Sequence, residues 1–149
     1  MPVIRLILPH EAWLLEGLAE EFFGEGDLPG ELDNDRFLSI WEMWLAQGAG
    51  IVIGAWREDV MVGAIGGLLA FSHMSGDLEL NEMFWFVAAT ERKTGVGIRM
   101  LDAFEDEARK RDVVRVTMVH LANPIGEKVG EIFKDRGYAP LETHYCMEL

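Results

Sequence analysis

Short apolar runs, separated by polar or glycine-rich turns, predict the strands of this chain. The runs are rich in β-branched and aromatic residues, and two of them flank a short polar turn as the arms of a hairpin do. Six runs are expected to form strands: residues 3–8, 51–56, 61–71, 78–87, 113–120 and 138–149. The last of these would close the chain.

Apolar side chains recur at intervals of three and four residues in other segments, which predicts helices with one buried face. These segments are residues 10–23, the stretch from Phe37 to Leu45, the stretch that follows Gly97, and residues 123–137. Asp33, Asn34 or Asp35 is placed to cap the second helix. Asn123 is placed to cap the last helix, and Gly137 to end it.

The resulting order, β-α-α-β-β-β-α-β-α-β, predicts an α/β fold with a mixed central sheet and helices on both faces. A parallel pair is expected where a helix connects strand 78–87 to strand 113–120. Gly66 and Gly67 inside strand 61–71 indicate a bulge, a close approach by substrate or tight helix packing. With 149 residues and no linker or repeat, residues 1–149 are expected to form a single domain.

Composition and charge narrow the classes of function. The formal net charge of −13 argues against a nucleic-acid partner, which needs a basic face. It suits a cationic substrate such as an amine, or it serves solubility alone. Cys146 is the one cysteine, which fits a cytoplasmic protein and leaves no internal disulfide. No apolar run is long enough to span a membrane, so no membrane partner is expected.

The stretch "ERKTGVG" (91–97) joins a predicted strand to a predicted helix. A helix N-terminus offers unpaired N–H groups and a positive dipole end, and glycines allow a ligand to approach the backbone closely. Arg92 and Lys93 add cations, and Thr94 adds a hydroxyl. These features predict a pyrophosphate site. The alternative is that Gly95 and Gly97 only turn the chain into a helix.

The pattern R-x-x-G-x-G over 92–97, with "FVAATER" leading into it and "IFKDRGY" near the end of the last helix, resembles the GCN5-related N-acetyltransferase superfamily. The resemblance covers most of the chain and is strongest from Leu78 to Tyr138. It implies that acetyl-CoA, as co-substrate, binds between strands 78–87 and 113–120. The resemblance implies these cofactor-binding residues: Phe86, Val87, Arg92, Lys93, Thr94, Gly95, Val96, Gly97 and Asn123.

The same resemblance implies direct attack by a primary amine, which must first lose a proton. Glu79 and Glu82 lie on the strand before the glycine stretch, where similar enzymes often place a general base. Strand alternation puts them on opposite faces, and Glu82 is the expected base because it is nearer to the acetyl position. The alternative is a solvated or ion-paired carboxylate without a catalytic role.

The usual general acid of the superfamily is a tyrosine in the last helix. Phe133 occupies that position here and has no proton to donate. Tyr145, on the predicted last strand, is the remaining candidate acid, although a structural tyrosine or protonation by water explains the sequence equally well. No histidine, cysteine or carboxylate set has metal-ligand spacing, so no metal is expected.

Three functions therefore stay open at this point. The first is a cytoplasmic N-acetyltransferase acting on a small-molecule or peptide amine, with a homodimer allowed by the resemblance. The second is a non-catalytic acyl-CoA-binding or sensor protein on the same fold, which Phe133 favours. The third is an unrelated anion-binding or interaction domain.

Overall fold

A computed structural model describes residues 1–149, which form two compact units, Met1–Met118 and Val119–Leu149. The expectation of a single domain over 1–149 stays a prediction. The first unit contains these elements in chain order: β1 (Val3–Leu6), the 3₁₀ helix η1 (Pro9–Leu15), α1 (Glu16–Gly26), α2 (Asn34–Ala46), β2 (Gly50–Arg57), β3 (Val60–Phe71), β4 (Leu78–Val87), the 3₁₀ helix η2 (Ala89–Glu91), α3 (Val96–Lys110) and β5 (Arg115–Thr117). The second unit contains α4 (Pro124–Asp135).

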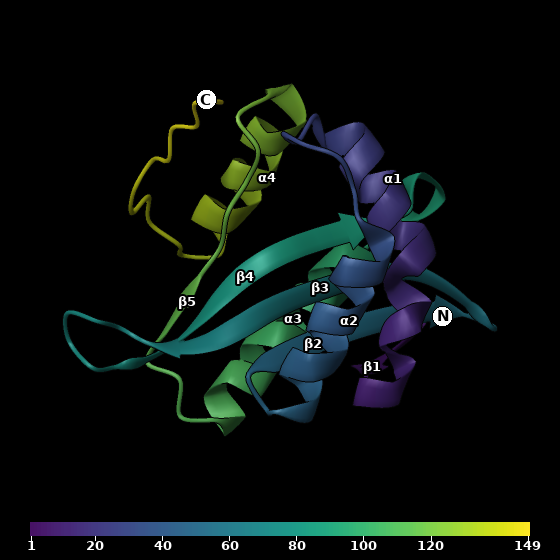
Figure 1. The fold of residues 1–149 in the computed structure, drawn as a ribbon, viewed down its shortest axis with the longest axis horizontal. Helices are drawn as coiled ribbons and strands as arrows, with labels where there is room; N and C mark the ends of the chain where they lie inside the picture. Colours follow the sequence, from purple (N-terminus) through teal and green to yellow (C-terminus); the bar gives the residue numbers. More distant parts are fainter. The chain divides into compact units, whose positions relative to one another are not determined.

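The five strands form one sheet in the order β1-β2-β3-β4-β5. The first three neighbouring pairs are antiparallel, and β4 and β5 are parallel, as the helical connection between them requires. Within the first unit, α1 and α2 cover one face of the sheet and α3 covers the other (Figure 1). The predicted α/β class, with a mixed sheet and helices on both faces, is confirmed.

Each face of the sheet has its own core. On the α3 face, Met100, Leu101 and Phe104 are completely buried, as the helical spacing of this segment predicts. On the other face, a cluster around Trp41 and Phe84 joins α1 and α2 to the sheet. Both faces of β2 are covered, so nearly all of its residues are buried and its sequence is a continuous apolar run.

Side-chain hydrogen bonds fix the ends of two helices. The Asp33 carboxylate accepts from the N–H of Arg36 at 3.0 Å, so Asp33 is the cap among the three residues that the sequence offered for α2. The Asn123 side chain accepts from the N–H of Gly126 at 2.8 Å and caps α4, as predicted.

Three predicted elements differ from the structure. The segment expected to begin the first helix at His10 is a 3₁₀ helix from Pro9, and the α-helix proper runs from Glu16 to Gly26. The strand expected over 113–120 is paired only over Arg115–Thr117. The strand expected over 138–149 is wrong: the second unit has no other strand whose backbone could pair with this segment, and the segment runs as irregular chain.

An ion pair ties β1 to η1. The Arg5 guanidinium donates to both carboxylate oxygens of Glu11 at 2.9 Å, and Glu11 also accepts from the N–H of Leu8. These bonds, chiefly those from Arg5, lower the pKa of the Glu11 carboxyl from its ordinary 4.5 to about 2. The ionised form of Glu11 is thus favoured in the folded state.

We expect this pair to contribute a pH-dependent part of the stability. Because the pKa of Glu11 is depressed on folding, its contribution is present above pH 4.5 and is lost as the pH falls toward 2. Glu11→Gln should therefore remove stability at pH 7 but little at pH 2, as measured by urea unfolding across that range. Equal losses of stability at both pH values would contradict the assignment, and the exposed Glu16→Gln serves as control.

Candidate functional site

Strand β4 pairs with β5 over only part of its length. Parallel pairing with β5 covers Glu79, Leu80 and Asn81 and ends where the Thr117 hydroxyl donates to Asn81 Oδ1 at 2.6 Å. Strand β4 continues to Val87 without a strand partner on that side. Because β4 and β5 part after Asn81, the Phe86–Val87 end of β4 is a place where an extended ligand could lie beside the strand.

The N-terminus of α3 lies close to this end of β4. Gly95 is the residue before the helix, with φ = +82°, a conformation that glycine adopts without strain. No side chain caps the helix, so its first-turn N–H groups are left for another acceptor. A Cβ at Gly97 would lie 3.3 Å from the Val87 side chain, so a glycine here lets the first turn pack against the end of β4.

The loop before α3 is held by a buried carboxylate. Glu91 is 7% exposed and accepts from Arg57 at 2.7 and 2.9 Å, and the hydrogen bond from Arg57 lowers the pKa of Glu91. The Thr94 hydroxyl donates to the Glu91 carbonyl at 2.8 Å and lies 3.1 Å from a Glu91 carboxylate oxygen. Thr94 thus stabilises the loop, and its hydroxyl is engaged within the chain, whereas Lys93 is exposed.

Arg92 links three parts of the first unit. Its Nε donates to the carbonyl of Val87 at 3.0 Å, and its guanidinium forms an ion pair with Glu25 at the end of α1. The same guanidinium lies 5.5 Å from the centre of the Phe86 ring. Arg92 therefore already donates to a main-chain acceptor at the end of β4, and a ligand that pairs with the Val87 carbonyl must compete with Arg92 or share the oxygen with it.

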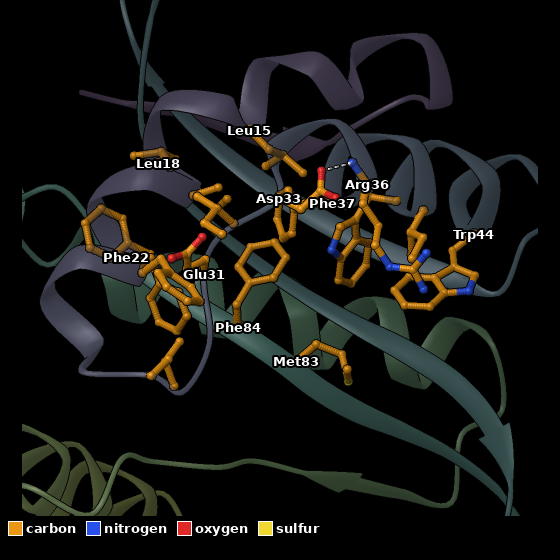
Figure 2. Close-up of a pocket in the computed structure, with 18 residues that line it drawn as sticks. Leu15, Leu18, Phe22, Glu31, Asp33, Arg36, Phe37, Trp44, Met83 and Phe84 are labelled. Carbon is orange, nitrogen blue, oxygen red and sulfur yellow. Dashed lines mark hydrogen bonds between the residues drawn. The ribbon is translucent and has the colours of Figure 1, made fainter. Parts of the chain in front are cut away.

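A pocket of about 400 Å³ lies between α1, α2, the loop that joins them and β4 (Figure 2). Its wall is mainly apolar and holds seven aromatic rings: Phe22, Phe23, Phe37, Trp41, Trp44, Phe84 and Phe86. Figure 2 shows Phe22 and Glu31 toward one end of the pocket and Trp44 toward the other. Phe86 lines the pocket and also belongs to the part of β4 that lies beyond its pairing with β5, so this end of β4 borders the pocket.

A bulge in β4 decides which side chains face the pocket. Gly66 lies opposite Phe84 and Gly67 lies opposite Glu82, so Met83 is the extra residue of β4. Met83 and Phe84 both line the pocket as a result. The bulge that the paired glycines indicated is confirmed.

The two glycines also show which face each side chain of β4 takes. A Cβ at Gly66 would meet the Trp41 ring of α2, whereas a Cβ at Gly67 would meet the Phe104 ring of α3. Directly opposed residues of an antiparallel pair share a face. Glu82, opposite Gly67, therefore points to the α3 face, is 5% exposed and does not line the pocket.

The model of the acetyltransferase (GNAT) family matches residues 14–138 of this sequence. The chain belongs to that family. This membership places it in the class of acetyl-CoA-dependent acyltransferases, and the resemblance drawn from the glycine stretch is confirmed.

Solved structures of acetyltransferases share this fold. An aminoglycoside acetyltransferase from an uncultured soil metagenomic sample has a TM-score of 0.80 and 13% identity, with 100% of this chain and 99% of that chain covered. A predicted acetyltransferase with acetyl-CoA from Clostridium acetobutylicum has a TM-score of 0.79 and 17% identity, with 100% of this chain and 96% of that chain covered. A ribosomal-protein-alanine N-acetyltransferase from Brucella melitensis biovar Abortus has a TM-score of 0.76 and 16% identity, with 100% of each chain covered. A comparison with curated protein sequences gave no match.

Three residues of interest lie in the second unit of this family member. Asn123 serves as the cap of α4. Phe133 is 6% exposed, and its ring centre lies 5.7 Å from that of Tyr138. Tyr145 lies in irregular chain and is 93% exposed, so it lacks the strand that was expected to hold it. The catalytic role of Tyr145 and the cofactor contact of Asn123 stay predictions.

Sequence reasoning did not single out Phe22, Phe37 or Met83 as residues of a binding pocket. The signal that could have found Met83 is the Gly66–Gly67 pair, because a bulge shifts the side-chain alternation of the strand opposite. Nowhere in residues 1–149 do three or more histidine, cysteine or acidic side chains gather as a metal would need. None of the helices combines the length and apolarity that crossing a bilayer demands.

Proposed function

We propose that this family member transfers the acetyl group of acetyl-CoA to a primary amine by direct attack. The observation that carries the proposal is that β4 and β5 part after Asn81, while β4 runs on to Phe86 and Val87 beside the uncapped N-terminus of α3. An extended arm with a diphosphate at one end matches this arrangement, because the strand edge offers main-chain pairing and the helix end offers N–H groups to an anion.

On this proposal, the amides from Gly95 to Ile98 hold the diphosphate, and Lys93 adds a cation at its exposed position. The pantetheine arm pairs with main-chain groups at Phe86 and Val87. Arg92 leaves the Val87 carbonyl to make room and becomes available to the phosphates. Val96 and Gly97 contribute backbone, and Thr94 acts by keeping the loop in shape through Glu91.

The transfer step forms one bond and breaks another. The nitrogen lone pair of the neutral amine attacks the thioester carbon, the N–C bond forms, and the C–S bond breaks with its electron pair going to sulfur. A main-chain N–H at the bulge of β4 is suited to donate to the carbonyl oxygen as negative charge develops there. The nitrogen loses one proton, and the sulfur gains one.

Glu82 is our candidate acceptor for the amine proton. It is the first residue of β4 beyond the paired stretch, so its position borders the opening between β4 and β5. Because its side chain points to the α3 face, we assign the proton transfer to a water that bridges the amine and Glu82. Tyr145 or water protonates the leaving thiolate, since Phe133 cannot.

An acyl-CoA-binding protein without transferase activity is the second candidate. The observation that favours it is Phe133, which is buried at the position where similar enzymes carry a tyrosine. This candidate needs the same diphosphate and pantetheine contacts but no acceptor amine. Cytoplasmic location and a homodimer are proposals under either candidate.

Titration with acetyl-CoA, followed by thiol-release measurements with a panel of primary amines, tests the proposal. Acetyl-CoA at 100 times its Kd should stabilise the folded protein by about 2.7 kcal/mol, seen as a rise in Tm. Thiol release that depends on an added amine then supports transfer. Stabilisation without amine-dependent thiol release favours the binding protein, and no stabilisation would contradict both candidates.

A further inference from the structure

We propose that the acceptor is a small primary amine with an aromatic or branched apolar body, and that this body binds in the pocket between α1, α2 and β4. This inference rests on the proposed function, because it concerns the same transfer. The observation behind it is that the pocket wall is mainly apolar and aromatic, whereas a polar amine requires hydrogen-bonding groups.

The wall is built for an apolar body. Six hydrophobic residues of the wall, all half-buried or buried, come from five segments, namely η1, α1, the α1–α2 loop, α2 and β4: Leu15, Phe22, Leu28, Phe37, Trp44 and Phe84. A volume of about 400 Å³ is at the lower end of the range for small-molecule sites. Aromatic rings in the wall gain most from a flat or branched apolar ligand.

The arrangement of the rings supports this. Trp41 packs edge-on against Trp44 and against Phe84, with ring centres 5.1 Å apart in both pairs. Trp41 is 3% exposed and fixes the other two rings, so the wall keeps its shape when empty. A preformed apolar pocket lowers the cost of ordering that binding would otherwise carry.

The charged residues of the wall come from the α1–α2 loop and the start of α2, and Figure 2 shows the Arg36 side chain extending toward the Trp44 end of the pocket. These charged residues are Glu31, Asp33 and Arg36, and Asp33 already accepts from the main-chain N–H of Arg36. Glu31 has no hydrogen bond or ion pair within the chain, and Figure 2 shows its carboxylate at the Phe22 end of the pocket. One carboxylate without a partner suits one ammonium group as it enters.

A polyhydroxylated or polycationic amine fits this wall poorly. Each hydroxyl or ammonium buried against these rings would lose water and find no partner, which weakens binding. Aminoglycoside acetyltransferases share the fold at 13% identity, but the fold does not determine the acceptor. The wall of this pocket favours an acceptor amine with an apolar body.

The experiment compares 2-phenylethylamine and tryptamine with spermidine and kanamycin, using the full chain and acetyl-CoA. Thiol release gives kcat/KM for each amine, and isothermal titration of the protein with each amine alone gives binding without chemistry. We expect kcat/KM for 2-phenylethylamine to exceed that for spermidine and kanamycin by at least about tenfold. Binding of 2-phenylethylamine should be measurable in the absence of acetyl-CoA.

Two variants of α2 form a matched pair. Ile40 is half-buried and lines the pocket, whereas Met43 is 46% exposed and does not. Ile40→Asn should reduce the preference for 2-phenylethylamine by about tenfold, and Met43→Asn should leave it unchanged. If Ile40→Asn fails to fold, the exposed Glu31→Gln replaces it and should raise the KM for 2-phenylethylamine while the Kd for acetyl-CoA stays the same.

The outcomes separate this inference from the proposed function. Faster thiol release with spermidine or kanamycin than with the aryl amines overturns the apolar class and leaves the transferase intact. Binding of 2-phenylethylamine without thiol release from any amine overturns the transferase and supports the pocket assignment. Neither binding nor turnover with any of the four amines overturns both.

Discussion

Replacing Gly97 with leucine is expected to weaken acetyl-CoA binding by at least about 100-fold, which corresponds to about 2.7 kcal/mol. The physical reason is the close approach of α3 to β4. A Cβ at this position would lie 3.3 Å from Val87 Cγ2 and 3.5 Å from the Trp85 ring, so a longer side chain must extend toward the helix end that is proposed to hold the diphosphate. Isothermal titration with acetyl-CoA measures the loss directly.

Gly17 provides a matched control for this substitution. Gly17 and Gly97 are each the second residue of a helix, α1 and α3 respectively, but a Cβ at Gly17 would meet nothing within 4 Å. Gly17→Leu should therefore leave the Kd for acetyl-CoA close to that of the wild-type protein. Thermal unfolding of both variants without ligand shows whether either has lost its fold. A folded Gly97→Leu variant that binds acetyl-CoA normally would remove the α3 N-terminus from the cofactor site.

Replacing Glu82 with glutamine is expected to lower kcat by about 10²–10⁴-fold, the range in which a positioned general base contributes. The amide keeps the size of the side chain, so packing on the α3 face should change little. Since the proposed role concerns the amine proton and not the cofactor, the Kd for acetyl-CoA should not change. Steady-state thiol release gives kcat, and isothermal titration gives the Kd.

Glu79 is the control on the same strand. Its carboxylate accepts from Arg115 at 2.9 Å in the paired part of β4, and a surface ion pair of this kind contributes only about 0–1 kcal/mol to stability. Glu79→Gln should thus keep kcat close to the wild-type value. A loss of less than about tenfold in Glu82→Gln, or equal losses in both variants, would show that Glu82 has a structural role.

The sequence predicted the parts of the site that depend on neighbours along the chain. Gly95 and Gly97 follow a strand and open a helix, and this order alone indicated a helix N-terminus that is open to an anion. Strand 78–87 was predicted with the bounds that the structure gives, because a segment rich in apolar and aromatic residues lies between two polar turns. The sequence left open which of three residues caps α2, since all three carry a suitable side chain.

Contacts between distant segments could not be predicted in the same way. The ion pair of Glu91 with Arg57 joins residues 34 positions apart, and the one between Arg92 and Glu25 joins residues 67 apart. Neither pair has a spacing that a periodic pattern could show. The Arg92 contact matters most, because it places the side chain on the Val87 carbonyl rather than toward the helix end.

The sequence by itself determined the family, the order of most elements and the loop proposed to hold the diphosphate, because hydrophobic periodicity, turn residues and helix-end chemistry act over a few residues. Only the tertiary structure decided three features of the site. They are the point where pairing between β4 and β5 ends, the opposite faces taken by Glu82 and Phe84, and the aromatic-walled pocket that Met83 lines. One extra residue in β4 reverses the side-chain alternation, and its position depends on register with a strand that comes earlier in the chain. Register is a property of paired strands, and local sequence therefore does not specify it.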